Sequence, residues 1–144
     1  MAILNYTTEV PVEKTIGEIQ RCLSMHGASS ILTDYDKDGV VTALSFKIMI
    51  GDKPVGYRLP TDWEPVLKIL EENPKVSRRL CTRDQAVRVA WRIVKTWIEA
   101  QMAIVETRMV DVSDVFLPYA VMKGGKTLAE TVKTDPGFLL GDGK

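Results

Sequence analysis

The stretch that decides the fold is residues 82–106, TRDQAVRVAWRIVKTWIEAQMAIVE. Its apolar residues recur at spacings of three and four, which places them on one face of a single long amphipathic helix. They are Val87, Trp91, Val94, Ile98, Met102 and Val105. Thr82 and Gln85 form a T-x-x-Q pattern, which predicts a capping box at the start of this helix. At 1.5 Å per residue the helix is roughly 37 Å long, enough to cross a small domain.

The segments before the long helix alternate between helical and strand patterns. Residues 1–9 are predicted to form an extended edge strand, and residues 11–26 a helix that buries an apolar stripe and ends at Gly27. Three short segments near residues 29–35, 40–50 and 55–59 alternate between apolar and polar residues, and tight turns join them. They are predicted to form an antiparallel meander with one buried face.

A second helix is predicted between this meander and the long helix. Thr61 or Asp62 caps it and Asn73 ends it, because Pro74 cannot continue a helix. After the long helix, Asp111 or Ser113 starts a short helix. The predicted fold class is therefore α+β, with the long amphipathic helix packed on a three-stranded sheet and short elements at the C-terminus. So small a sheet leaves edges and one face open, which predicts a homo-oligomer.

Length and composition fit a single globular domain. The chain has 144 residues, of which 45% are hydrophobic and 26% are charged. We expect the domain to span residues 1–130 and a flexible tail to span residues 131–144, where turn residues are frequent. The sequence contains no run of about 18 apolar residues, so no membrane span is predicted. The N-terminus lacks the pattern of a signal peptide. These features predict a cytoplasmic protein.

The formal net charge is zero, but positive charge is concentrated before and within the long helix. From Lys75 to Lys95 there are seven basic residues and one acidic residue, Asp84, so this window carries +6. The candidate phosphate-binding residues are Arg78, Arg79, Arg83, Arg88, Arg92 and Lys95. Arginine binds phosphate through two parallel hydrogen bonds, so this segment predicts binding of nucleic acid or of a phosphate-bearing nucleotide. The alternative is a solvated helix face that pairs with acidic residues elsewhere.

No catalytic or metal-binding pattern accompanies these residues. The turn at residues 34–39 matches the D-x-D-x-D-G opening of a calcium loop, but the twelfth position is Ser45 rather than glutamate, so a hairpin turn is expected. Cys22 and His26 lie one helical turn apart without an identifiable third member. We therefore predict no catalytic residue, no metal site and no cofactor, and a protein that is not an enzyme.

A resemblance rests on the motif Trp91-Arg92-x4-Trp97-x-x-Ala100-Gln101 and the following Val115-Phe116-Leu117-Pro118-Tyr119. The hairpin residues Gly27, Ala28, Ile31 and Tyr35 belong to the same pattern. Together they resemble a family of small proteins carried by bacteriophages and prophages. The resemblance implies a viral protein that works in the cytoplasm of a bacterial host, where such proteins assist DNA replication and recombination or block host defence. It implies no site residues, because the pattern contains no known active site.

Three functions remain open at this point, of which two are non-enzymatic and the third, an enzyme, is the least favoured. The first is a non-enzymatic accessory protein that binds nucleic acid through the arginine-rich helix and connector. The second is an anti-defence protein, either an oligomeric sponge that sequesters a nucleotide immune signal or an inhibitor that binds a host defence protein. A protein that follows a polynucleotide backbone needs a continuous basic stripe, whereas a sponge needs a pocket of limited size.

Overall fold

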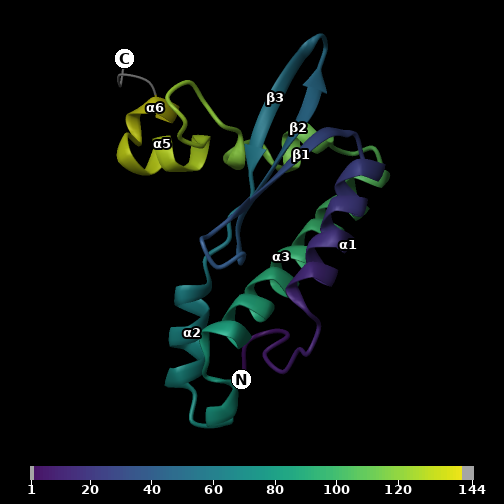
Figure 1. Cartoon of the computed structure of the whole chain (residues 1–144). Helices are drawn as coiled ribbons and strands as arrows, with labels where there is room; N and C mark the ends of the chain where they lie inside the picture. Colours follow the sequence, from purple (N-terminus) through teal and green to yellow (C-terminus); the bar gives the residue numbers. More distant parts are fainter. Residues whose placement is uncertain (1, 141–144) are drawn as a thin grey trace.

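The fold is α+β, as predicted, and the computed structural model describes residues 2–140 (Figure 1). The elements in chain order are α1 (Val12–Met25), β1 (Ala28–Tyr35), β2 (Val41–Ile50), β3 (Lys53–Arg58), α2 (Trp63–Glu72), η1 (Arg78–Leu80), α3 (Arg83–Glu106), α4 (Val112–Val115), η2 (Leu117–Tyr119), α5 (Leu128–Thr134) and α6 (Gly137–Leu140). Among the described residues no helix is long and apolar enough to cross a membrane.

Helix α3 is the central element because apolar residues on two of its sides belong to two separate core clusters. The larger cluster joins Trp91, Ile98 and their neighbours on α3 to α1 and to one face of the sheet. The smaller cluster joins Val89 and its neighbours to α2 and to the connector that contains η1. Figure 1 shows α1 and α3 side by side along most of their length. The apolar stripe read from the sequence therefore faces the core.

The sheet has the order β1-β2-β3, and both pairings are antiparallel. Phe46 of β2 pairs with Ile31 of β1 and with Tyr57 of β3, and these residues lie on the face that packs against the helices. On the other face Leu32 is 61% and Met49 48% exposed. A homo-oligomer that covers this face stays a prediction.

The C-terminal segment returns to the sheet through an aromatic cluster. The ring of Trp97 on α3 meets Phe116 and Tyr119 edge to face at centroid distances of 5.4 and 5.5 Å. Phe116 also contacts Phe46 at 5.4 Å, so the cluster ties the end of α4 to the core face of the sheet. Edge-to-face pairs of this kind add to the free energy of burial. The motif residues Trp97, Phe116 and Tyr119 thus have a packing role.

The N-terminal segment differs from its prediction, and the C-terminal segment contains two short helices. The strand predicted for residues 1–9 is wrong, because residues 4–7 form turns in which Asn5 has a φ of +63°. Of the predicted tail, residues 131–140 lie in or between α5 and α6, and residues 141–144 lie outside the described part of the chain. Thr127 and Glu130 form a reciprocal capping box at the start of α5.

One ion pair joins the C-terminal ends of α1 and α3. His26 follows α1, where its Nδ1 lies 2.7 Å from the carbonyl oxygen of Cys22 and its Nε2 lies 2.9 Å from Glu106 Oε1. Both partners are acceptors, so only the doubly protonated imidazolium donates to both. The carbonyl of Cys22, followed by the Glu106 carboxylate, raises the pKa of His26 above its ordinary value of 6.5.

We therefore expect the stability of the fold to depend on the charge of His26. Because its pKa is raised in the folded state, the contribution is complete below the unfolded value and is lost as the pH rises through the folded value. The difference in free energy of unfolding between wild type and His26→Gln should shrink between about pH 5.5 and about pH 8.5. Urea unfolding at both pH values measures it, and a constant difference would contradict this reading.

Candidate phosphate-binding site

The connector between α2 and α3 is fixed by two buried apolar residues. Val76 is 5% and Leu80 9% exposed, and both pack in the smaller core cluster. Because Leu80 points into the core at the end of η1, the adjacent Arg78 and Arg79 are left exposed. A short anchored turn therefore presents two arginines to solvent immediately before α3.

Gln85 is the residue that organises this end of α3. It is 2% exposed, and its Nε2 donates to the carbonyl oxygens of Tyr6 and Thr8 at 2.9 and 3.0 Å. Its Oε1 accepts from Arg88 Nε and Nη2 at 3.0 and 2.8 Å. The amide thus ties the N-terminal segment to α3 and fixes the orientation of the Arg88 guanidinium, whose Nη1 makes no hydrogen bond to any described residue.

Only half of the predicted capping box forms, because the side chain of Gln85 has other partners. Thr82 Oγ1 accepts from the backbone N–H of Gln85 at 3.1 Å, as predicted. The side chain of Gln85 does not return to the backbone of Thr82, because it binds the carbonyls of the N-terminal segment instead. The sequence pattern identified the residue but assigned its amide to the wrong partner.

Arg79 and Arg88 line one polar hollow of about 290 Å³. The other residues around it are Thr7, Thr8, Glu9, Leu80 and Gln85. Thr8 Oγ1 accepts from the backbone N–H of Val10 at 3.2 Å, so its own O–H remains a free donor. Neither arginine forms an ion pair with a carboxylate of the described chain. We call this feature the Arg79–Arg88 hollow.

Arg78 and Arg83 lie elsewhere, each beside acidic residues. Arg78 lines a separate hollow with Glu71 and Glu72, although it forms an ion pair with neither. Arg83 Nη2 donates to Asp36 Oδ2 at 2.9 Å, and its guanidinium lies 5.3 Å from the centroid of the Trp63 ring. These two candidates therefore do not join Arg79 and Arg88.

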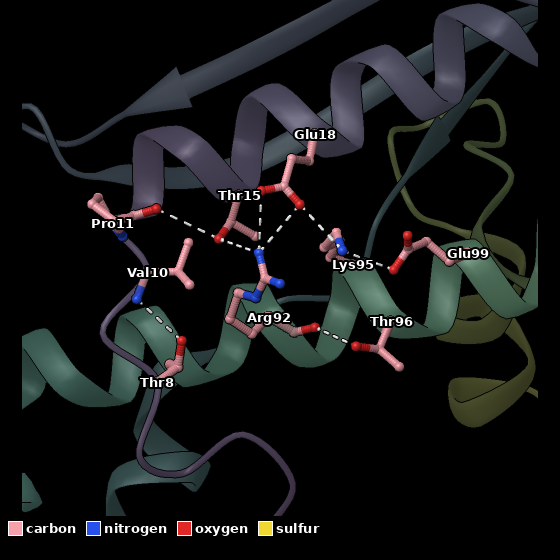
Figure 2. A network of polar contacts seen from close by, with 9 residues as sticks. All are labelled: Thr8, Val10, Pro11, Thr15, Glu18, Arg92, Lys95, Thr96 and Glu99. Carbon is pink, nitrogen blue, oxygen red and sulfur yellow. Dashed lines mark hydrogen bonds and ion pairs between the residues drawn. The ribbon is translucent and has the colours of Figure 1, made fainter.

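Arg92 and Lys95, which were predicted to bind phosphate together with Arg88, pair with acidic side chains of the protein itself. Figure 2 shows both side chains directed from α3 toward Glu18 on α1. The Glu18 carboxylate lies 3.3 Å from Arg92 Nη1 and 3.1 Å from Lys95 Nζ, and Lys95 also pairs with Glu99 at 2.9 Å. The two basic side chains are only 19% and 16% exposed. They join two helices, and their charges are paired within the described chain.

The pKa values in this network follow from its contacts. Burial alone would raise the pKa of Glu18, but the hydrogen bond and charge of Lys95, together with Arg92, outweigh it and lower that pKa. The hydrogen bond to Glu99, followed by the one to Glu18, raises the pKa of Lys95. Both shifts favour the charged forms of Glu18 and Lys95 in the folded protein.

Arg92 and Arg78 should consequently respond differently to the same substitution. Arg92→Gln should lower the free energy of unfolding by about 1–2 kcal/mol, because it leaves Glu18 with one charged partner fewer at a half-buried position. Arg78→Gln is the matched control and should change it by less than about 0.5 kcal/mol. Chemical denaturation of the two variants tests this, and equal effects would show that the α1–α3 network adds nothing.

The other candidate sites have structural roles. Asp36 Oδ1 accepts from the backbone N–H groups of Val40 and Asp38, and the Val40 bond contributes most to lowering the pKa of Asp36. This confirms the hairpin turn at residues 34–39, with Gly39 at a φ of +79°. His26 contacts the backbone carbonyl of Cys22 rather than its thiol. Across residues 2–140 no group of three or more His, Cys, Asp or Glu residues is placed to hold a metal ion.

Comparisons of the chain with protein-family models, with curated proteins and with solved structures found no match.

Proposed function

We propose that this protein is a non-enzymatic binding protein for a phosphate-bearing nucleotide, which it holds at the Arg79–Arg88 hollow. The observation that carries the proposal is that two arginines free of carboxylate partners line one polar hollow, and one of them is held in place by a buried glutamine. A guanidinium offers a planar pair of donors that matches two phosphate oxygens. The hydroxyls of Thr7 and Thr8 provide further donors at the same hollow.

The distribution of charge favours a small nucleotide over a long polynucleotide. A polynucleotide backbone needs a row of free cations, but Arg83, Arg92 and Lys95 are engaged with carboxylates. Together with the resemblance to bacteriophage proteins, this distribution of charge supports the proposal that the protein sequesters a nucleotide signal of host defence.

Nucleic acid is the second candidate, and one observation favours it. Lys75 and Arg78 are exposed on the connector that carries Arg79, and neither forms an ion pair within the described part of the chain. A single strand that crosses the connector would bring one phosphate to the hollow and the next to these side chains. In that case affinity would fall steeply with salt, whereas a small nucleotide gives a weak salt dependence.

Native mass spectrometry of the protein purified from its bacterial host tests the proposal. The wild-type protein should carry a bound mass of nucleotide size, and the double variant Arg79→Gln/Arg88→Gln should not. A ladder of oligonucleotide masses would favour the second candidate. A bound nucleotide that is retained by the double variant would show that another part of the molecule binds it.

A further inference from the structure

A second hollow lies on a different side of α3 and shares no lining residue with the Arg79–Arg88 hollow. Helix α3 contributes Arg83, Val87 and Trp91 to this second hollow, whereas Gln85 and Arg88 line the first. At about 100° per residue these two sets of residues project in different directions. The remaining walls come from the start of β2 and from residues 61–63 at the start of α2.

The size and lining of this second hollow restrict what it holds. Its volume is about 140 Å³, close to the ~150 Å³ cavity that accommodates one benzene ring. Trp63, Trp91, Val41 and Val87 give it aromatic and aliphatic walls. A single planar ring therefore fits, and a bicyclic ring with an attached sugar is too large.

Beside this hollow, Thr61 carries a hydroxyl without a partner in the described part of the chain. Its side chain lines the hollow, while its Oγ1 is closed off from water and makes no hydrogen bond to any residue from 2 to 140. A buried hydroxyl without a partner is unfavourable and calls for an explanation. The hydroxyl is closed off in this conformation, so it would reach a ligand in the hollow only after rotation about χ1 to another staggered position.

Arg83 adds a charged donor at the same hollow. Its guanidinium stacks at 5.3 Å from the Trp63 ring centroid, and Asp36 binds one amino group, Nη2. The Nε and Nη1 groups form no hydrogen bond with other described residues, so they remain available to a carbonyl oxygen. Asp36 is itself fixed by the amides of the turn after β1, so Arg83 is held in place.

We propose that this hollow, which we call the Thr61 hollow, binds one pyrimidine-type ring that carries carbonyl and N–H groups on its edge. The ring packs among Trp63, Val87 and Trp91. Its carbonyl oxygen accepts from Arg83, and its N–H donates to the reoriented hydroxyl of Thr61. The inference does not rest on the proposed phosphate site, since it concerns different residues and a neutral ring.

Fluorine NMR of 5-fluorouracil in the presence of the full chain tests this site. The wild-type protein should shift or broaden the fluorine resonance in a saturable manner at millimolar probe, and uracil should compete. Adenine should not compete, because its bicyclic ring exceeds the hollow. No saturable change, or equal competition by adenine, would overturn the proposal.

Two variants separate the site from non-specific binding. Thr61→Val keeps the shape and removes the hydroxyl, so uracil affinity should fall roughly three- to tenfold, the effect of one neutral hydrogen bond. The thermal midpoint should hold or rise, because the variant loses an unsatisfied group. Thr96→Val, on the exposed part of α3 away from the hollow, is the matched control and should bind like wild type. Arg83→Lys provides a second measure, and unchanged uracil affinity in both Thr61→Val and Arg83→Lys would overturn the assignment.

A competition experiment shows whether the natural ligand is a free base or nucleoside, or a base within a nucleic acid. Displacement of 5-fluorouracil by oligothymidylate at lower concentration than by uracil assigns the site to a base of a nucleic acid. Stronger displacement by uracil assigns it to a free base or nucleoside. Failure of both to displace the probe would show that its signal arises outside the Thr61 hollow and would overturn the proposal.

Discussion

Gln85→Leu should lower the free energy of unfolding by about 2–4 kcal/mol, the largest effect expected from a single polar residue of this protein. Leucine has a similar volume but cannot donate to the carbonyls of Tyr6 and Thr8, which Gln85 Nε2 binds at 2.9 and 3.0 Å. Each part-buried carbonyl then loses its partner. The N-terminal segment should detach from α3, and hydrogen exchange in residues 2–10 should rise.

Gln101→Leu is the matched control, since it makes the same substitution on the same helix. The side-chain amide of Gln101 forms no hydrogen bond with the described chain. It should change stability by less than about 0.5 kcal/mol. Gln85→Glu places a carboxylate beside Arg88 and repels the two carbonyls. We expect that variant to be destabilised like Gln85→Leu and also to lose ligand affinity, because Arg88 then has a carboxylate partner and the segment that carries Thr7 and Thr8 detaches. Equal stability of the Gln85→Leu and Gln101→Leu variants would contradict the role of Gln85.

The sequence was most informative where local spacing determines structure. The three- and four-residue periodicity of residues 82–106 predicted α3, and Thr82 predicted its first residues, because capping depends on neighbours in the chain. The alternation in β2 and the Asp38-Gly39 turn likewise predicted the meander. These elements depend on contacts between residues close in sequence.

The candidate site could be predicted less well from the sequence, because its contacts join distant parts of the chain. Gln85 meets Tyr6 and Thr8 across nearly 80 residues, and no local pattern encodes that pairing. Arg92 and Lys95 look like members of a solvated face until α1 brings Glu18 against them. The only sequence signal was that Glu18 lies on the predicted first helix, which is not enough to choose its partner among many cations.

The double variant Arg79→Gln/Arg88→Gln should lose about a hundredfold or more in affinity for the nucleotide ligand. Each guanidinium contributes a charge-assisted contact to phosphate, roughly 1.5–3 kcal/mol, and each 1.4 kcal/mol is a factor of ten. Arg79 is exposed, but Arg88 is half-buried and its loss removes both hydrogen bonds to Gln85 Oε1, so the free energy of unfolding should fall by about 1–3 kcal/mol. Affinity is therefore compared under conditions in which the variant stays folded. The retained hydrogen bonds of Gln85 to the N-terminal segment should keep the hollow formed.

Arg21→Gln/Arg108→Gln is the matched control for this variant. Both arginines are exposed, form no ion pair with the described residues and lie outside the hollow. The control removes the same amount of positive charge, so it separates recognition at the hollow from the general attraction of an anion to the protein.

Phosphorus NMR of inorganic pyrophosphate tests most directly whether Arg79 and Arg88 form a phosphate site. Pyrophosphate carries the recognised group alone, so its resonance reports phosphate binding whatever nucleotide is the natural ligand. The wild-type protein and the Arg21→Gln/Arg108→Gln control should broaden the resonance in a saturable manner, and Arg79→Gln/Arg88→Gln should leave it sharp. Equal broadening by Arg79→Gln/Arg88→Gln, or no broadening by the wild-type protein, would contradict a phosphate site at this hollow.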